Sequence, residues 1–299
     1  MKNNRLKILV TGHRGFIGGY LYKKLIDLGY EVYGFDVVDG DDLLNFNKIE
    51  EAIKKVDVVY HIAAQADLND MVMDFDKAKM GMEINITATQ NISLICAKYN
   101  KWLIFASTLC VYGNIKKIAE EDNVLPNPSE IYACSKYSAE WIIKGFSKSF
   151  GLEYTILRFA TIYGEGMRPA LGAKVFIDQA LKNMNITVHG DGKQTRTLTY
   201  VGDLVDGCIS VLKNRNKALN QVINLSTQKS ISAIKMARDI KSILKSKSSV
   251  ISIGQRKNQT LHEKISVKKA KELLGWKANT TWSSGIKKAI KFFKKNTQK

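Results

Sequence analysis

Residues 7–18 read K-I-L-V-T-G-H-R-G-F-I-G, an apolar run that leads directly into three glycines spaced three residues apart. An apolar run followed by an amphipathic segment predicts a strand, a tight turn and a helix. Gly12 permits the turn, Gly15 lets the backbone approach a ligand, and Gly18 lets the helix pack closely on the strand. Because a helix N-terminus attracts anions, the stretch predicts a site for the diphosphate of a dinucleotide.

An acidic residue ends the second predicted strand. Asp36 closes V-Y-G-F-D, 24 residues after Gly12, where an acid can accept hydrogen bonds from the hydroxyls of a ribose. A 2′-phosphate would meet that carboxylate, and no arginine follows it directly. We therefore expect NAD rather than NADP. Three glycines in an ordinary turn are the alternative.

Short apolar runs alternate with helical patterns through the first half of the chain. We expect strands at residues 6–10, 31–35, 57–62, 102–106 and 155–158, and helices at 16–28, 47–54, 77–99 and 131–149. This alternation predicts right-handed crossovers and a parallel sheet covered on both faces. Further elements are expected at 171–182, 186–189, 203–213, 231–245, 267–274 and 285–295. The predicted fold is α/β: a Rossmann-like doubly wound parallel sheet in residues 1–165, to which later segments return, and a smaller mixed C-terminal substrate lobe in residues 166–299.

The charge of the chain is divided unevenly. Residues 1–150 hold 18 basic and 19 acidic side chains, a balance of −1, whereas residues 151–299 hold 28 and 9, a balance of +19. We interpret the excess as a solvated lysine-rich surface, with the apolar face of a tail helix buried beneath it. That face comprises Ile286, Ala289, Ile290 and Phe293. Binding of nucleic acid is the alternative, and a positive lobe also suits a nucleotide diphosphate.

The bulk composition favours a globular protein without a membrane segment. Hydrophobic residues make up 45% of the 299 residues and charged residues 25%. No apolar run reaches the roughly 18 residues that cross a bilayer, and the Lys/Asn-rich start does not resemble a secretory signal. Cys96, Cys110, Cys134 and Cys208 each fall in an apolar stretch, which predicts reduced, buried thiols and a cytoplasmic protein. The four histidines lack ligand spacing, so no metal is expected.

A second group of residues suits proton transfer. Tyr132 and Lys136 stand at i and i+4 in Y-A-C-S-K, on one face of a predicted helix, and Thr108 ends a predicted strand. A phenol has a pKa near 10, and a neighbouring ammonium lowers it toward the working range. We expect Tyr132 to act as catalytic base and acid on an alcohol, Lys136 to tune the phenol, and Thr108 to hold the hydroxyl. A chance tyrosine–lysine pair on an ordinary helix is the alternative.

The spacing G-x-x-G-x-x-G, taken with Thr108 and the Tyr132/Lys136 pair, resembles the extended branch of the short-chain dehydrogenase/reductase superfamily, the NAD-dependent epimerase/dehydratase family. The likeness runs from residue 6 to about residue 290. It implies that NAD is the cofactor and that Thr108, Tyr132 and Lys136 are catalytic. It also implies the residues that bind NAD: Gly12, Gly15, Phe16, Ile17, Gly18, Asp36, Asp42, Leu43, Ala63, Ala64, Asn85, Tyr132 and Lys136.

Two residues after the threonine separate the reactions of this family. Dehydratases place Asp-Glu there and nucleotide-sugar decarboxylases a glutamate, whereas this chain has Leu109 and Cys110. The likeness is therefore closest to UDP-glucose or UDP-glucuronate 4-epimerases. It implies oxidation of the sugar at C4 to a 4-keto intermediate and re-reduction on the other face. A 4-keto reductase or dehydrogenase of the same fold is the alternative, and a non-catalytic nucleic-acid-binding Rossmann protein a more distant one.

The resemblance also implies a UDP-sugar substrate and a homodimer. Arg196 and Arg256 match arginines on the diphosphate, and Thr161 with Arg168 resembles epimerases of UDP-glucuronate, although UDP-glucose, UDP-galactose or their N-acetyl forms are favoured. The expected substrate-binding residues are Thr108, Thr161, Arg168, Arg196 and Arg256. Two helices per subunit would pair in the dimer, with Ile92, Ile95, Tyr99, Tyr137, Trp141 and Phe146 as candidates.

Overall fold

The computed structural model describes residues 5–66, 71, 74–114, 117–254 and 264–297. Six strands form a parallel sheet in the order β10-β5-β4-β3-β1-β2. Their bounds are β1 (Lys7–Thr11), β2 (Glu31–Phe35), β3 (Val58–His61), β4 (Trp102–Thr108), β5 (Tyr154–Phe159) and β10 (Gln221–Leu225). The chain runs from β1 to the edge strand β2 and then crosses to β3 on the other side of β1. Ligands bind at such a switch point, beyond the carboxyl ends of the strands.

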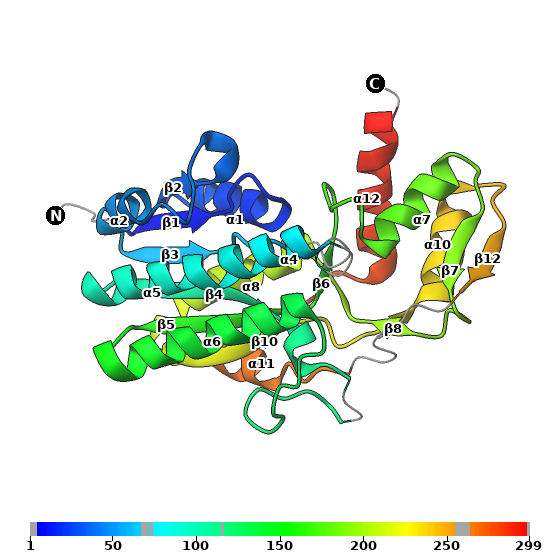
Figure 1. Cartoon of the computed structure of the whole chain (residues 1–299). Coiled ribbons are helices and arrows are strands. Elements are labelled where there is room, and N and C mark those ends of the chain that lie inside the picture. The colour runs from blue at the N-terminus through cyan, green and yellow to red at the C-terminus, as the bar shows by residue number, and fades with distance from the viewer. Residues whose placement is uncertain (1–4, 67–70, 72–73, 115–116, 255–263, 298–299) are drawn as a thin grey trace.

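Helices cover both faces of the sheet (Figure 1). One face carries α2 (Phe46–Lys54), α5 (Ala88–Lys98) and α6 (Ile131–Phe150), and α4 (Phe75–Met82) runs into α5 through a π-helical turn, Glu83–Thr87. The other face carries α1 (Phe16–Asp27), α8 (Val201–Lys213) and α11 (Lys268–Leu274). Within β1, Ile8 and Val10 pack into one core and Leu9 into the other. Burial on both faces explains why the strands read as continuous apolar runs.

A second lobe lies beyond the carboxyl edge of the sheet (Figure 1). It contains α7 (Gly172–Leu181), β7 (Ile186–His189), α10 (Ala233–Leu244), β12 (Val250–Ile253) and α12 (Trp282–Thr297). Short strands and one short helix complete the fold: β6 (Thr161–Tyr163), β8 (Thr195–Arg196), β9 (Leu198–Tyr200), α9 (Arg215–Ala218) and β11 (Ile231–Ser232). Between these segments, α8 packs against α1 and β10 pairs with β5. A division of the chain at residues 165 and 166 stays a prediction.

The prediction of an α/β doubly wound parallel sheet is confirmed. The expected helices and strands lie within a few residues of the observed ones, and Ile286, Ala289 and Ile290 are buried on α12. The short strands β6, β8, β9, β11 and β12 and the sheet strand β10 were not predicted. Among the described residues, none of the helices has the length and apolarity to cross a membrane.

The prediction that all four thiols are buried is wrong. Cys96 and Cys208 are buried, but Cys134 is partly exposed and Cys110 is exposed. A 3₁₀ turn, Leu109–Tyr112, follows β4 directly and turns Cys110 toward the cavity described below, although its neighbours in sequence are apolar.

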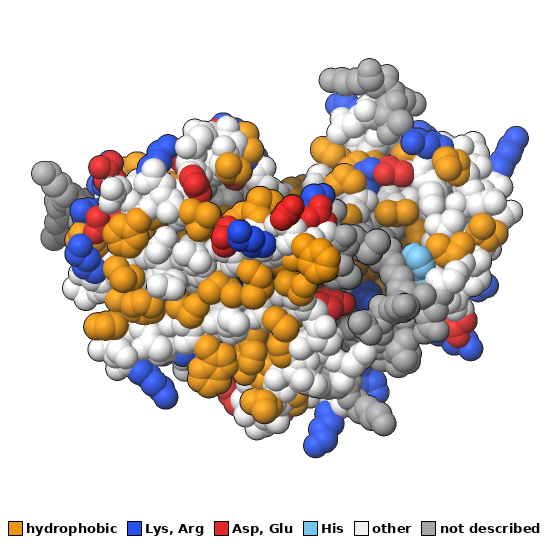
Figure 2. Space-filling view, in the orientation of Figure 1, with side chains coloured by type: hydrophobic (Ala, Val, Ile, Leu, Met, Phe, Trp, Pro, Cys, Tyr) orange, Lys and Arg blue, Asp and Glu red, His pale blue; other side chains and the backbone are white. Residues whose placement is uncertain are grey.

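Large apolar side chains remain exposed on the helices of one face. They lie on α4, α5 and α6: Phe75, Met80, Leu94, Ile131, Trp141 and Phe150. Figure 2 shows hydrophobic side chains gathered over this face of the molecule. The prediction that Ile92 and Ile95 contact a second subunit is wrong, because both side chains are fully buried in the core between α5 and the sheet. A contiguous exposed apolar patch of this kind marks an interaction site more often than chance exposure does.

Candidate active site and dinucleotide crevice

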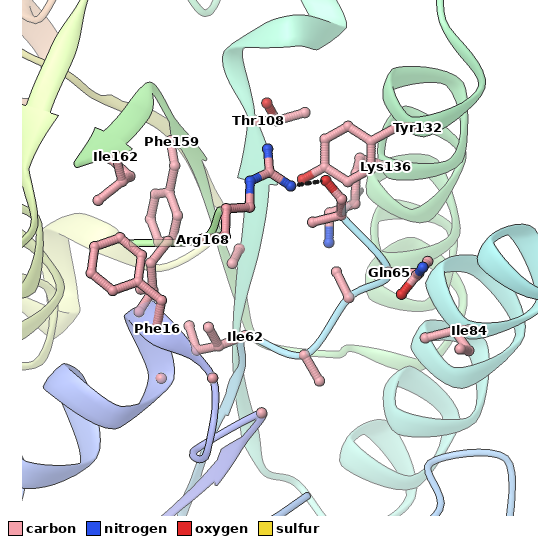
Figure 3. A pocket seen from close by; sticks show the side chains of 18 of the residues that line it. Phe16, Ile62, Gln65, Ile84, Thr108, Tyr132, Lys136, Phe159, Ile162 and Arg168 are labelled. Atoms are coloured by element: carbon pink, nitrogen blue, oxygen red, sulfur yellow. Dashed lines mark hydrogen bonds between the residues drawn. The ribbon is translucent and has the colours of Figure 1, made fainter. Parts of the chain in front are cut away.

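A cavity of about 620 Å³ opens at the carboxyl ends of β1, β2, β3, β4 and β5. Its walls come from the glycine turn after β1, the segment after β3 and the start of α6 (Figure 3). The site residues predicted from the sequence that line it are Gly12, Gly15, Phe16, Ile17, Gly18, Asp36, Asp42, Leu43, Ala63, Ala64, Thr108, Tyr132, Lys136, Thr161 and Arg168. The parallel sheet therefore brings segments more than 150 residues apart to one crevice.

The glycine turn is built as a cradle for an anion. Gly12 has φ of +73°, and a Cβ there would lie 2.8 Å from the backbone of Ala63. A Cβ at Gly18 would lie 2.0 Å from the carbonyl oxygen of Gly12, so α1 approaches β1 more closely than any other residue allows. Gly15 is the N-cap of α1 without a capping side chain, and the first turn holds no acidic residue. The backbone N–H groups at this end suit a diphosphate, so the turn fits a dinucleotide.

Two acidic residues lie where the nucleoside end of a dinucleotide would bind. Asp36 follows β2 directly and accepts hydrogen bonds from the backbone N–H groups of Arg14 at 2.9 Å and Val38 at 3.1 Å. Asp42 accepts from the N–H of Leu44, and Leu43 beside it is buried. The carboxylate of Asp36 is thereby fixed at the rim of the cavity. This arrangement fits a ribose diol better than a phosphate.

Thr108, Tyr132 and Lys136 line the same end of the cavity. Thr108 ends β4 and accepts a hydrogen bond from the backbone N–H of Cys110 at 3.2 Å. Tyr132 and Lys136 stand one turn apart near the start of α6, and the Lys136 ammonium lies 4.0 Å from the centroid of the Phe105 ring. The lysine side chain is only 2% exposed. A hydroxyl, a phenol and an amine thus share one partly apolar compartment.

Burial shifts the pKa values of both ionisable groups toward their neutral forms. It lowers the pKa of Lys136 to about 7, and the charge of Glu140 opposes this shift. It raises the pKa of Tyr132, the neighbouring Cys110 adds to the shift, and the charge of Arg168 opposes it. The sequence predicted a phenol whose pKa is lowered by Lys136. In the structure Arg168 is the cation that acts in that direction.

A buried ion pair lies next to Lys136 and Thr108. Glu140 lies one turn after Lys136 on α6 and accepts hydrogen bonds from the Nε and Nη2 atoms of Arg158 at 2.9 and 2.7 Å. It also accepts from the Ser107 hydroxyl at 2.6 Å, and Ser107 immediately precedes Thr108. The pair therefore joins α6 to β4 and β5. An arginine inside the apolar strand Tyr154–Phe159 is the sequence signal from which a buried ion pair could be predicted.

Asn85 does not line the cavity, although the sequence predicted contact with the cofactor. It is 1% exposed, lies in the π-helical turn, and exchanges hydrogen bonds with the backbone of Gln65. Its amide also donates to the Ser135 hydroxyl, which donates to the carbonyl of Tyr132. Asn85 thus connects Gln65, which lines the cavity, to the first turn of α6.

The predicted substrate residues fall into three groups. Thr161 and Arg168 line the cavity, and Arg168 donates a hydrogen bond to the carbonyl of Ala66 and points toward Thr108 and Tyr132 (Figure 3). Arg196 lies on β8, outside the lining of this cavity, where it donates to the carbonyl of Thr195. Arg256 lies outside the described residues.

Comparisons with known proteins agree with this geometry. The model of the NAD dependent epimerase/dehydratase family matches residues 8–226. A UDP-N-acetyl-alpha-D-glucosaminuronate decarboxylase of Bacillus cytotoxicus is 30% identical, over 96% of this chain and 98% of that protein. The match spans nearly the whole of both sequences.

Two solved structures resemble the whole chain. One is a UDP-glucose 4-epimerase of Thermotoga maritima with UDP-glucose, at 26% identity and a TM-score of 0.90, covering 98% of this chain and all of that one. The other is a UDP-glucuronic acid 4-epimerase of Bacillus cereus in complex with UDP-glucuronic acid and NAD. It is 26% identical with a TM-score of 0.91, and the match covers 97% of this chain and all of that one.

The buried amine predicts a pH-dependent stability. The pKa of Lys136 is about 7 in the folded chain and near 10.4 in the unfolded chain. Between pH 7 and pH 10.4 the unfolded chain therefore binds more protons than the folded chain. The free energy of unfolding should therefore rise with pH from 7 to 9. Lys136→Met should raise it by about 4 to 5 kcal/mol at pH 6 and by about 2 kcal/mol at pH 9. Urea unfolding at these pH values measures the difference.

Lys148→Met is the matched control, since Lys148 is exposed on the same helix. It should change the free energy of unfolding little at any pH. If the Lys136→Met and parent curves run parallel from pH 6 to pH 9, the charge of Lys136 is not the cause.

Proposed function

The chain belongs to the NAD dependent epimerase/dehydratase family, and we propose that it is a 4-epimerase of a UDP-sugar. One observation carries the proposal: a cavity that joins the glycine turn and Asp36 to Thr108, Tyr132 and Lys136. The first set suits a dinucleotide and the second suits an alcohol. Epimerisation at C4 needs only these two parts, because oxidation and reduction occur at the same carbon.

The cofactor would lie along the turn of Gly12 and Gly15, with Asp36 on the ribose diol and Lys136 at the nicotinamide end. When bound, NAD supplies a hydride acceptor that also returns the hydride. Leu43 beside Asp42 and Ala63 after β3 line the cavity and would give the cofactor apolar contact surface. This assignment extends the NAD dependence of the family to particular residues of the chain.

The chain's own residues handle the proton. Thr108 would hold the C4 hydroxyl by a hydrogen bond, and the phenolate of Tyr132 would take its proton as the C4–H bond breaks. In the return half, the phenol gives that proton back to the carbonyl oxygen. Burial raises the pKa of Tyr132, so the phenol must first lose its own proton. Lys136, one turn later with a pKa of about 7, would stabilise the phenolate when the amine carries its charge.

The absence of acids at the reacting end supports an epimerase over a dehydratase or decarboxylase. Among the described lining residues, the carboxylates are those of Asp36, Asp41 and Asp42, all beyond β2. Leu109 and Cys110 line the cavity where related enzymes that eliminate water or carbon dioxide carry acids. Neither side chain has the carboxyl group that those enzymes use at this place.

We propose UDP-glucose and UDP-galactose as the first substrates to test. One observation favours UDP-glucuronate as a second candidate: the Arg168 guanidinium points into the cavity beside Tyr132 (Figure 3). A guanidinium pairs well with a carboxylate, and the similar Bacillus cereus structure contains UDP-glucuronic acid. In the neutral case Arg168 would serve only to bind its own backbone partner, Ala66, and to lower the pKa of Tyr132.

We also propose a homodimer through the exposed apolar face of α4, α5 and α6 (Figure 2). Trp141 is 54% exposed and Leu94 is 38% exposed on adjacent helices of this face. Burial of such side chains against a second copy removes apolar area from water. These residues replace Ile92 and Ile95 as candidates for the contact.

The first test removes the phenol. Purified protein should interconvert UDP-glucose and UDP-galactose, or UDP-glucuronate and UDP-galacturonate, without added cofactor. Tyr132→Phe should lower this activity at least about a hundredfold while bound NAD is retained. Chromatography of the sugars and the absorbance of released NAD measure both. Tyr137→Phe on the same helix is the control. Full activity of Tyr132→Phe would remove Tyr132 from the mechanism, and steady consumption of NAD(P)H with a keto-sugar would contradict the epimerase.

The second test concerns Arg168. If its guanidinium binds a C6 carboxylate, Arg168→Leu should lower kcat/KM for UDP-glucuronate about a hundredfold and for UDP-glucose less than about tenfold. Arg238→Leu, at an exposed position on α10, should change neither value. Equal losses with both sugars would remove the carboxylate role.

The third test concerns assembly. The double variant Leu94→Glu and Trp141→Glu should sediment as a monomer where the parent chain sediments as a dimer, because buried unpaired carboxylates are costly. Phe292→Glu is the control, since Phe292 is 40% exposed on α12, away from this face. A dimer that survives the double substitution would place the contact elsewhere.

A further inference from the structure

The glycine turn carries a cation beside the carboxylate expected to hold the ribose diol. Arg14 stands between Gly12 and Gly15 and lines the cavity. Its backbone N–H donates to Asp36 at 2.9 Å, so the residue is fixed beside the carboxylate expected to hold the ribose diol. In dinucleotide-binding folds, an arginine near this point accommodates the 2′-phosphate of NADP. Arg14 therefore has the position of an NADP-binding residue in a chain of an NAD-dependent family.

The side chain of Arg14 is held by a second acid. Its Nε atom lies 3.0 Å from both carboxylate oxygens of Asp39, and its Nη2 atom lies 2.7 Å from Oδ1. Asp39 ends the short 3₁₀ turn that follows Asp36, and the same turn brings Gly40 into a left-handed conformation. Two parallel contacts of this kind occupy the Nε–Nη2 edge of the guanidinium, one of the two edges that could bind a phosphate through two hydrogen bonds.

Asp39 is held from its other side as well. The Nε2 atom of His13 lies 3.1 Å from Asp39 Oδ2. The His13 ring packs against Tyr22 and over Gly34, where a Cβ would lie 2.4 Å from the ring. The His13 side chain is only 11% exposed. Asp39 is thus positioned by a packed ring rather than by a flexible surface contact, and its carboxylate keeps its place beside Arg14.

Charge around the ribose site leads to the same conclusion. Arg14 contributes one positive charge, and Asp36 and Asp39 contribute two negative charges. Asp41, the next acid, is paired with Lys48 at 2.6 Å. The Arg14 side chain is 57% exposed, so its ion pair alone is worth little and a phosphate could compete for it. A 2′-phosphate bound beside Arg14 would also be repelled by the carboxylates of Asp36 and Asp39. Removal of either carboxylate should therefore increase the affinity for NADP.

We propose that Asp39 is a cofactor-specificity residue: it keeps the Arg14 guanidinium from the 2′-phosphate of NADP and so enforces the preference for NAD. The inference rests on the proposed function, because it concerns the same dinucleotide site. It assigns part of the selectivity to a residue three positions beyond Asp36. Asp36 would hold the ribose diol, and Asp39 binds the guanidinium of Arg14 so that it does not contact the cofactor.

The experiment measures binding rather than turnover. The parent chain and its variants are dialysed to equilibrium against an equimolar mixture of NAD and NADP, and the bound dinucleotides are quantified by chromatography. The parent should retain NAD in large excess. Asp39→Asn should shift the bound ratio toward NADP by at least about tenfold, since a freed guanidinium can form charge-assisted hydrogen bonds with phosphate.

Three variants make the result specific. Arg14→Gln combined with Asp39→Asn should reverse most of the shift, because the cation that binds the phosphate is lost. Arg14→Gln alone should leave the ratio within about twofold, because the guanidinium is already occupied. This single variant also tests the idea if Asp39→Asn does not fold. Asp27→Asn, which removes an equally charged acid paired with Lys23 on α1, should have no effect.

The outcomes separate the inference from the proposed function. A parent chain that retains NAD, with an unchanged ratio in Asp39→Asn, overturns the role of Asp39 and leaves the cofactor site intact. A large change in Arg14→Gln alone overturns it too, because Arg14 would then already act on the dinucleotide. A parent chain that retains neither dinucleotide contradicts the proposed cofactor site itself.

Discussion

The buried contact between Glu140 and Arg158 is the interaction on which the geometry of the site depends. Both side chains are almost fully buried, at 0% and 2% exposure, where an unpaired charge would be strongly destabilising. Neither charge can therefore be buried without the other, and their contact constrains how α6 packs on β5. The Ser107 hydroxyl, bonded to the same carboxylate, fixes β4 in that arrangement. The ion pair is better understood as a device for position than as a source of net stability.

A second set of buried hydrogen bonds fixes the opposite side of α6. Asn85 connects Gln65 to Ser135, and Ser135 bonds the carbonyl of Tyr132. The π-helical turn around Asn85 inserts an extra residue into the helix, and such turns are frequent at functional sites. The start of α6 is thus held from two directions, by an ion pair and by an amide. The proposed role of Tyr132 would require this fixation, because small misplacements of a catalytic group cost large factors in rate.

Much of this could be predicted from the sequence, because its physics is local. A left-handed glycine at residue 12, an acid at the end of β2 and a pair of residues one turn apart on a helix are each visible in short windows. The missed features are set by tertiary contacts. Arg158 lies on β5, and its ion-pair partner Glu140 lies 18 residues earlier on α6. Strand β10 pairs with β5 at the sheet edge, although the chain between them passes through the second lobe. No short window shows that Cys110 faces a cavity or that Asn85 turns away from one.

The same ion pair explains the electrostatics of the reacting end. Both oxygens of Glu140 are already bonded to Arg158 and Ser107, so its charge only partly offsets the burial of Lys136. The amine consequently keeps a pKa of about 7 rather than that of a salt-bridged lysine. If Glu140 paired directly with Lys136, the pKa of the amine would be higher. By binding Glu140, Arg158 thus keeps that carboxylate from pairing directly with Lys136.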